Sequence, residues 1–169
     1  QNRCRAWRAC VAACPYKKVY FNPHFGRSEK CIFCFPRVEQ GVAPACARQC
    51  PGRLRFVGFL EDLDGPIHKL VHQWKVALPL HPEFGTEPNV SYVPPILPAS
   101  FDAEGRFSEE PRVPTEYLRY LFGPEVDQAL ITIDAEMERK KAGTPSELMD
   151  LTIATHQKSL FNMTLLQFF

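Results

Sequence analysis

The alternation of apolar and polar positions predicts short elements in the first third of the chain. Residues 19–22 and 28–33 flank the turn sequence Pro23-His24-Phe25-Gly26, and this arrangement predicts a β-hairpin. Residues 44–49 favour a short helical turn that brings two cysteines onto one face. Residues 1–14 have no apolar period, and we expect them to form a loop without regular structure.

The middle of the chain predicts one strand, one helix and a long extended segment. Residues 54–60 form an apolar run that is typical of a strand. From residue 66 to 76 apolar side chains recur at spacings of three and four, which predicts a helix with proline near its first position. His68 and His72 are four residues apart in it, but no third metal ligand is nearby, so we expect both to be exposed. Dense proline between residues 78 and 114 excludes long strands and helices, and favours an arm laid over a partner or over the first part of the chain.

The last third of the chain is predicted to be helical. Residues 124–141 carry apolar side chains on one face of a helix. Residues 144–147 read Thr-Pro-Ser-Glu, a capping box with proline at the first helical position, and predict a second helix through about His156. The apolar end, residues 160–169, is too short to cross a bilayer. Burial against a partner subunit and burial in the protein's own core are both open for it.

Composition and charge narrow the possible functions. The formal net charge of +1 gives no reason to expect binding to nucleic acid or to a membrane surface. No apolar run approaches the ~18 residues that a membrane-spanning helix needs, so we expect no direct membrane span. Nothing in the sequence resembles a catalytic triad, a phosphate-binding loop or an acid/base pair, so substrate chemistry is expected to belong to another chain.

All seven cysteines lie in the first fifty residues, and their spacing carries the strongest chemical signal. The second half of this stretch reads Cys31-x2-Cys34-x11-Cys46-x3-Cys50-Pro51. The first half matches the bacterial ferredoxin run C-x2-C-x2-C-x3-C-P except at one position, because it reads Cys4-x2-Trp7-x2-Cys10-x3-Cys14-Pro15. Gaps of two residues let one loop aim successive thiolates at different irons of one cube, whereas the cysteine before proline reaches a neighbouring cluster.

The tryptophan in place of the second cysteine predicts a cluster with three irons. Indole nitrogen has no lone pair to offer a metal, so Trp7 cannot replace the missing thiolate. The cluster held by Cys4 and Cys10 is therefore expected to be [3Fe-4S], with Trp7 filling the vacated corner. A normal [4Fe-4S] cube is expected at Cys31, Cys34 and Cys46.

Seven cysteines could also bind zinc, form disulfides or belong to a stand-alone ferredoxin. A structural zinc module also favours paired thiolates at short spacings, but the ferredoxin gaps and the two Cys-Pro pairs favour iron and sulfide. Disulfides suit a small loop-rich fold, and seven is an odd number. A stand-alone two-cluster ferredoxin is also open, with four cysteines on one cluster and Cys4, Cys10 and Cys50 on the other. Its difficulty is the long chain that follows the cysteines, which a soluble carrier would not need.

The residues around the cysteines resemble a known family, the iron–sulfur β subunits of the complex molybdenum oxidoreductases. This family includes the β subunits of nitrate reductase, ethylbenzene dehydrogenase, dimethylsulfide dehydrogenase, and selenate and chlorate reductases. The similar stretches are Cys4-Arg5-Ala6-Trp7-Arg8-Ala9-Cys10, Cys14-Pro15-Tyr16-Lys17-Lys18, Glu29-Lys30-Cys31-Ile32-Phe33-Cys34, Cys50-Pro51-Gly52-Arg53 and residues 74–83. The Cys50-Pro51-Gly52-Arg53 form looks more like the branch of the ethylbenzene dehydrogenase, dimethylsulfide dehydrogenase, selenate reductase and chlorate reductase β subunits than like membrane-bound nitrate reductase.

The resemblance implies an α+β fold with a ferredoxin-like iron–sulfur cluster domain. Such subunits resemble two fused bacterial ferredoxins that hold four clusters, and this chain would be the C-terminal half. A cluster-binding region would then occupy residues 1–60, a helix with an extended proline-rich arm residues 61–114, and a helical subunit-docking extension residues 115–169. Upstream sequence with two to three further cysteine motifs is expected.

The resemblance also implies how the ligands are shared. Cys4 and Cys10 would hold the [3Fe-4S] cluster with one upstream cysteine, and Cys14 would cap the adjacent [4Fe-4S] cluster. A third cluster, of the [4Fe-4S] kind, would take an upstream partner together with Cys31, Cys34 and Cys46. Cys50 would serve a fourth cluster, also [4Fe-4S].

The function implied is electron transfer. Single electrons would pass between a molybdenum-containing catalytic α subunit and a haem b γ subunit, and the molybdenum cofactor and haem b would be bound only by those partners. The favoured branch implies a periplasmic location, whereas a nitrate reductase relative would lie at the cytoplasmic face of the inner membrane.

Overall fold

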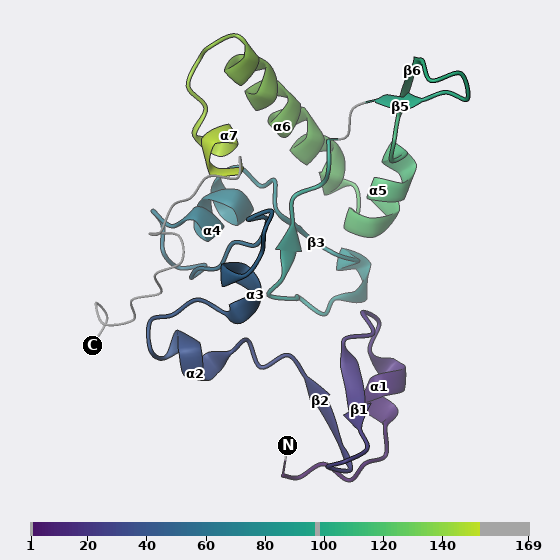
Figure 1. Cartoon of the computed structure of the whole chain (residues 1–169), viewed down its shortest axis with the longest axis vertical. Helices are drawn as coiled ribbons and strands as arrows, with labels where there is room; N and C mark the ends of the chain where they lie inside the picture. Colours follow the sequence, from purple (N-terminus) through teal and green to yellow (C-terminus); the bar gives the residue numbers. More distant parts are fainter. Residues whose placement is uncertain (1, 97–98, 153–169) are drawn as a thin grey trace. The chain divides into compact units, whose positions relative to one another are not determined.

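The computed structural model describes residues 2–96 and 99–152, which contain both helices and strands. They divide into two compact units, and the boundary falls between Gln49 and Cys50 (Figure 1). We call the part up to Gln49 the first unit and the part from Cys50 the second unit. The predicted α+β class is confirmed, because both units mix short helices with antiparallel strand pairs.

The first unit is built around a β-hairpin. Strand β1 (Val19–Asn22) pairs with β2 (Arg27–Lys30) in an antiparallel register in which Val19 faces Lys30 and Asn22 faces Arg27. The turn is closed by the His24 amide, which donates to Asn22 Oδ1 at 3.0 Å, and by Gly26 with a positive φ. The predicted hairpin is confirmed. Three short helices complete the unit: α1 (Ala9–Ala13), α2 (Phe35–Val38) and α3 (Ala45–Arg48).

Helix α1 corrects the expectation of an unstructured loop over residues 1–14. Its sequence Ala-Cys-Val-Ala-Ala is rich in alanine, the residue with the highest helix propensity, so a single turn forms in spite of the missing apolar period. It begins after Arg8 and ends at Cys14, whose ψ of 113° is extended. The residue that follows is Pro15, and a residue before proline is disfavoured in helical conformation.

The predicted strand over residues 54–60 is wrong. The structure places no strand there, and no neighbouring segment pairs with these residues. Leu54, Phe59 and Leu60 are exposed instead. An apolar run becomes a strand only when a partner satisfies its backbone, and the sequence of the run alone does not supply that partner.

The predicted helix from residue 66 is present but changes type. Helix α4 (Pro66–His68) continues into η1 (Lys69–Gln73), a π-helical turn closed by the Trp74 amide, which donates to the Lys69 carbonyl at 2.8 Å. The amides of Val76 and Ala77 both donate to the Leu70 carbonyl, and the chain then leaves the helix. Leu70 is buried, as the periodicity predicts.

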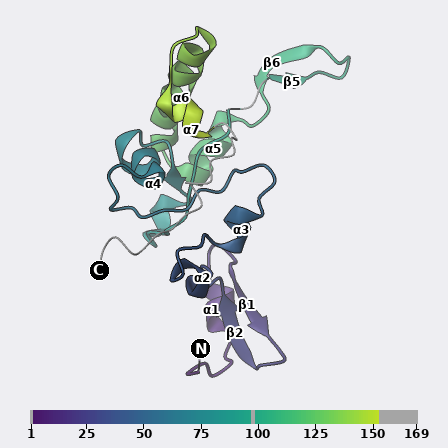
Figure 2. The same ribbon diagram turned by 60° about the vertical axis from the view of Figure 1, so that its left-hand side comes forward.

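The proline-rich segment forms strands of two to five residues, which agrees with the expectation that long ladders are excluded. Strand β3 (Leu78–Pro79) pairs with β4 (Ser91–Tyr92), and a 3-10 turn, η2 (Pro82–Phe84), lies between them. Strand β5 (Ala99–Phe101) pairs with β6 (Phe107–Pro111), and both ribbon views show this hairpin extending away from the helices of the second unit (Figures 1 and 2).

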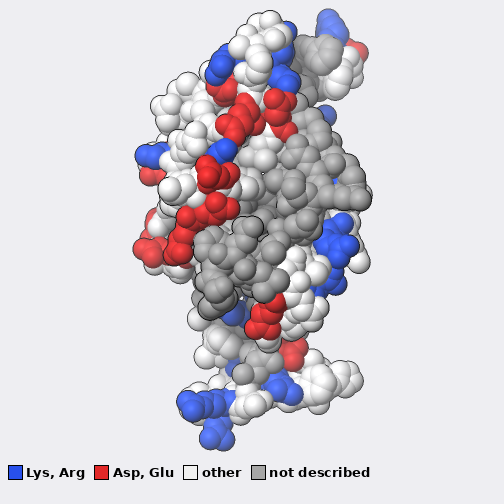
Figure 3. All heavy atoms as spheres, turned by 90° about the vertical axis from the view of Figure 1, so that its left-hand side faces the viewer, with Lys and Arg blue, Asp and Glu red and all other residues white. Residues whose placement is uncertain are grey.

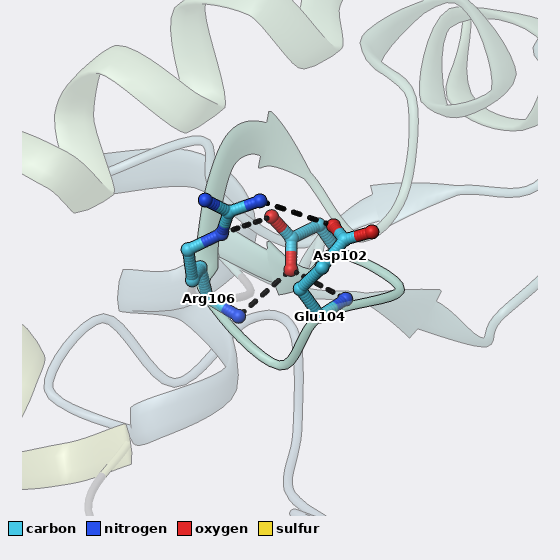
Figure 4. A network of polar contacts seen from close by, with 3 residues as sticks. All are labelled: Asp102, Glu104 and Arg106. Carbon is cyan, nitrogen blue, oxygen red and sulfur yellow. Dashed lines mark hydrogen bonds and ion pairs between the residues drawn. The ribbon is translucent and has the colours of Figure 1, made fainter.

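A single carboxylate closes the turn between β5 and β6. Asp102 accepts hydrogen bonds from the amides of Glu104 and Arg106, at 3.0 and 2.8 Å, and its other oxygen pairs with the Arg106 guanidinium (Figure 4). Arg106 also reaches Glu104 at 3.2 Å. The charges are exposed, so the backbone bonds contribute more to the turn than the ion pairs do.

Three helices end the described chain: α5 (Thr115–Phe122), α6 (Glu125–Lys141) and α7 (Glu147–Thr152). The predicted helix over 124–141 is confirmed, with Val126, Ala129 and Ile133 buried on one face. The cap of α7 differs from the prediction. Ser146, not Thr144, accepts a bond from the amide of Met149 and donates to Glu136, so α7 is fixed to α6 by its own cap. The predicted end at His156 and the apolar residues 160–169 lie outside the described residues.

The apolar core lies in the second unit and consists of two clusters. The first gathers the end of the π-helical turn against α6 and α7 and contains Leu70, Val76, Ala77, Ile133, Leu148 and Met149. The second joins β3 to α5 and α6 and contains Leu78, Leu118, Phe122, Val126 and Ala129. Among the helices that the structure describes, none is both long and apolar enough to cross a membrane.

Candidate metal centre

The seven cysteines lie in short loops and helix ends, and all are free thiols. Cys14 ends α1, Cys34 begins α2, and Cys10 and Cys46 lie within one-turn helices. Four of them are exposed, namely Cys4, Cys10, Cys31 and Cys46, and the other three are half-buried. Free cysteine is normally among the most buried residues, so this exposure points to thiols kept for a ligand and not for packing.

The loops that carry the cysteines are bent by left-handed backbone. Six residues that are not glycine have positive φ within three positions of a cysteine: Ala6, Arg8, Lys17, Phe33, Cys34 and Arg53. Each such residue costs roughly 1 kcal/mol or more relative to ordinary backbone. Successive backbone N–H groups turned in this way form concave surfaces that favour negative charge. The strain therefore lies at the positions that would face thiolates.

Within the described part of the chain, backbone amides donate to four of the seven sulfurs. Cys4 Sγ accepts from the amides of Ala6 at 3.5 Å and Ser28 at 3.4 Å, and Cys31 Sγ accepts from the amide of Phe33 at 3.3 Å. The bond from Ser28 lowers the pKa of the Cys4 thiol most, followed by the bond from Ala6. A lowered pKa favours the thiolate, which is the form that binds a metal.

The two Cys-Pro pairs form the same turn. The amide three residues after the cysteine donates to the cysteine carbonyl at 3.1 Å in both cases, from Lys17 to Cys14 and from Arg53 to Cys50. Lys17 and Arg53 also share a positive φ of 52° and 50°.

In each turn the next amide donates to the sulfur, from Lys18 to Cys14 at 3.4 Å and from Leu54 to Cys50 at 3.5 Å. These bonds are the largest cause of the lowered pKa of both thiols. Cys14 and Cys50 therefore present their sulfurs in the same way.

Trp7 lies in the loop between Cys4 and Cys10 and is 84% exposed. The next residue, Arg8, places its guanidinium 4.0 Å from the centre of the Phe21 ring, which fixes the loop to the hairpin through a cation–π contact. The proposed role of Trp7, filling the corner of a three-iron cluster, stays a prediction.

The described residues do not complete a metal site by themselves. Within residues 2–96 and 99–152, no group of three or more His, Cys, Asp or Glu side chains lies close enough to hold one ion. The donor set fits iron–sulfur chemistry, because the thiols are free, largely exposed and bonded by amides, but no full set of ligands is assembled here. The rings of His68 and His72 lie 5.0 Å apart with no third ligand, and His68 Nδ1 contacts the Leu60 carbonyl at 2.8 Å.

Basic residues lie near the cysteines in the sequence. Arg3, Arg5, Arg8, Lys17, Lys18 and Lys30 are all exposed. In Figure 3, Lys and Arg side chains gather at the lower end, the height at which Figure 1 draws the N-terminus and the hairpin. Solvent and salt screen exposed charges, so in this chain their influence on a bound cluster is expected to be small.

Sequence reasoning missed the Ser28 amide as a sulfur donor. Ser28 is 24 residues from Cys4, and no local spacing signals the bond. It also missed the left-handed residues beside the cysteines, because alanine, arginine, lysine and phenylalanine carry no signal for positive φ.

A known domain family matches the first unit and the beginning of the second. The 4Fe-4S dicluster domain family matches residues 1–60. The ferredoxin-like iron–sulfur fold that the family resemblance implies is thereby confirmed, whereas zinc and disulfides lose their support.

Curated relatives match nearly the whole chain. The chlorate reductase subunit beta of Ideonella dechloratans is 55% identical over 165 residues, which cover 96% of this chain and 50% of that protein. The dimethylsulfide dehydrogenase subunit beta of Rhodovulum sulfidophilum is 52% identical over 164 residues, which cover 97% of this chain and 50% of the relative. The respiratory nitrate reductase 1 beta chain of Escherichia coli is 36% identical over 72% of this chain and 35% of its own length.

The first two of these relatives are about twice as long as the part that this chain covers. The alignments with these two relatives cover 96% and 97% of this chain, so the similarity seen in the cysteine loops extends through the second unit. The chain belongs to the family of iron–sulfur β subunits of the complex molybdenum oxidoreductases.

Proposed function

We propose that the chain is part of an electron-transfer subunit that relays single electrons through [4Fe-4S] and [3Fe-4S] clusters. The observation that carries this proposal is the set of five amide-to-sulfur hydrogen bonds at Cys4, Cys14, Cys31 and Cys50. Amide donors stabilise negative charge on sulfur, and hydrogen bonds to cluster sulfurs are among the groups that set a cluster's reduction potential. The same bonds would also stabilise thiolates at a zinc site, so the choice of iron and sulfide rests on the cysteine spacing and on the match to the 4Fe-4S dicluster domain family.

The ligands are assigned as the family pattern implies. Cys4 and Cys10 would hold the [3Fe-4S] cluster with one upstream cysteine, and Cys14 would cap the neighbouring [4Fe-4S] cluster. A third cluster takes Cys31, Cys34 and Cys46 with an upstream partner, and Cys50 serves a fourth. Sharing with upstream cysteines suits Cys50, which has no cluster partner in this chain, whereas Cys31, Cys34 and Cys46 would have to draw together on a cluster, because no three such side chains among the described residues lie close enough to hold one ion. The chain would then be the C-terminal half of a double ferredoxin arrangement.

The partners proposed are a molybdenum-containing catalytic α subunit and a haem b γ subunit. Relatives named as subunits of chlorate reductase and dimethylsulfide dehydrogenase support a partner with the catalytic site. The location proposed is the periplasm, because the Cys50-Pro51-Gly52-Arg53 form resembles the branch to which a periplasmic location belongs. Fractionation of cells that express the full-length protein tests this location, because recovery with the cytoplasmic marker enzymes would contradict it.

The proline-rich segment and the C-terminal extension would be docking surfaces for these partners. The stretch from Asn162 to Phe169 lies outside the described residues, and its apolar sequence is what motivates the proposal. Deleting it is expected to weaken co-purification of the subunits while the iron–sulfur spectrum of the β subunit persists. A deletion variant that loses its clusters would instead place these residues in the subunit's own core.

Metal analysis and spectroscopy of the intact subunit test the electron-transfer proposal. Stoichiometric iron and acid-labile sulfide are expected, and stoichiometric zinc with little iron would contradict the proposal. The oxidised protein is expected to show the electron paramagnetic resonance signal of a [3Fe-4S] cluster. The substitution Trp7→Cys is expected to replace that signal by a four-iron cluster of lower potential, and an oxidised wild-type protein with only four-iron clusters would refute the ligand assignment.

A further inference from the structure

Ser28 lies where the hairpin meets the first cysteine loop. It belongs to β2, opposite Phe21 of β1, and its amide donates to Cys4 Sγ instead of to the partner strand. In an antiparallel pair, alternate residues turn their N–H groups away from the partner strand, so the amide at this position is free to reach the sulfur. The edge of the hairpin therefore supplies a donor to a cysteine 24 residues earlier in the chain.

The Ser28 hydroxyl has no acceptor among the described residues. Its Oγ is buried and makes no hydrogen bond of ordinary geometry with them. It belongs to the residue whose amide lies 3.4 Å from the Cys4 sulfur, so the hydroxyl is within reach of that sulfur. A buried hydroxyl without an acceptor is unfavourable, and natural proteins rarely retain one without a use.

We propose that the Ser28 hydroxyl is a second donor to the sulfur of Cys4 when a cluster is bound, and that it raises the reduction potential of the cluster held there. A thiolate accepts a hydrogen bond far better than a neutral thiol does, so the bond forms when Cys4 becomes a ligand. Adding one electron makes the cluster and its sulfurs more negative. A donor aimed at the sulfur stabilises the reduced form more than the oxidised form, which raises the potential.

This proposal rests on the proposed function, since it requires that Cys4 ligate a redox-active cluster. It concerns a positioning residue and not a ligand, because Ser28 acts on the cluster through the Cys4 sulfur. The remaining clusters, whose cysteines Ser28 does not contact in the described structure, serve as an internal reference. Their potentials are expected to stay unchanged when Ser28 is altered.

The test is a redox titration of the intact complex, followed by electron paramagnetic resonance. Ser28→Ala removes the hydroxyl and keeps the backbone amide. We expect the reduction potential of the [3Fe-4S] cluster to fall by up to about 59 mV, which corresponds to a tenfold change in the equilibrium constant of a one-electron couple. Ser91→Ala is the control, because Ser91 is a strand serine of the second unit, and it is expected to shift nothing.

A matched pair of variants covers the case in which Ser28→Ala assembles poorly. Threonine and valine have nearly the same shape and both suit a strand, but only threonine keeps the hydroxyl. Ser28→Thr is expected to retain the wild-type potential, whereas Ser28→Val is expected to show the lowered one. Equal potentials in these two variants would overturn the inference, even when the iron content and the [3Fe-4S] signal uphold the proposed function. Absence of that signal from the wild-type protein would refute the ligand assignment, and stoichiometric zinc in place of iron would refute the proposed function itself.

Discussion

The two units of the molecule are stabilised in different ways. The second unit contains two clusters of buried apolar side chains contributed by helices and strands far apart in sequence. In the described part of the first unit, the buried apolar side chains are small, such as Ala43 and Ala47, whereas Trp7, Tyr20, Phe25, Ile32, Phe33 and Phe35 are exposed. A unit of about fifty residues seldom buries enough surface to fold by packing alone, and such units usually rely on metals or partners. We therefore expect the first unit to depend on bound clusters for its stability, and the second on apolar packing.

The largest expected effect comes from removing iron and sulfide. In the intact protein this is expected to abolish protection of the amides in β1 and β2, while those in α5 and α6 remain protected, because both apolar clusters found among the described residues lie in the second unit. Hydrogen–deuterium exchange followed by mass spectrometry, before and after treatment with a chelator, measures both regions at once. Unchanged protection in the hairpin would show that the first unit is stable without its clusters.

A core substitution should act on the second unit alone. Leu148 is 1% exposed, and Leu148→Ala is expected to lower the free energy of unfolding of that unit by about 2–5 kcal/mol, through lost burial and the cavity left behind. The iron–sulfur spectrum should not change. Ile131→Ala, at a position 62% exposed, is the control and is expected to change stability by less than about 0.5 kcal/mol. Loss of clusters in Leu148→Ala would mean that the two units do not fold independently.

A smaller effect is expected at the start of α7. Ser146→Ala removes the acceptor for the Met149 amide and the donor to Glu136, and is expected to cost about 1 kcal/mol, the usual effect of losing an N-cap. Chemical denaturation of the second unit measures it. Thr144→Ala provides the comparison, since the structure gives Thr144 no part in this cap. An equal loss of stability in the threonine variant would restore the cap predicted from the sequence.

The smallest effect is a dependence on pH. The hydrogen bond from Ser146, followed by the Arg139 guanidinium, lowers the pKa of Glu136 below its ordinary value. The stabilisation is therefore present above the unfolded pKa of about 4.3 and is lost as the pH falls through the lowered folded value. Thermal unfolding at neutral pH and at acidic pH should show a weaker decline in Glu136→Gln than in the wild type. Parallel declines in the two proteins would remove Glu136 from the causes of acid destabilisation.

Local signals predicted the parts of the fold that depend on neighbouring residues. The hairpin follows from two short runs around a turn with glycine, and α6 follows from its apolar period. The strand expected at 54–60 failed because pairing needs a second segment. The π-helical turn from Lys69 to Gln73 was missed because its apolar spacing is also that of an α-helix.

For the candidate site, too, the sequence predicts the features that depend on local spacing and misses those that depend on distant residues. The spacing singles out all seven cysteines as candidate ligands, and this assignment stays a prediction. The donor that Ser28 supplies to Cys4 could not be anticipated from spacing, because the hairpin has to form before the two residues meet. The sequence also gives no sign that the Ser28 hydroxyl lacks a hydrogen-bond partner among the described residues, and the structure does.

The Cys-Pro turn is a five-residue segment that occurs twice in the chain with the same backbone hydrogen bonds. Its two copies read Cys-Pro-Tyr-Lys-Lys and Cys-Pro-Gly-Arg-Leu, yet their backbone bonds differ by at most 0.1 Å in length. The middle of the turn tolerates an aromatic ring or no side chain at all, so evolution can vary those side chains without disturbing the ligand. For a protein engineer the five-residue cassette offers a way to install one thiolate with its own amide donor at the end of a helix or a loop.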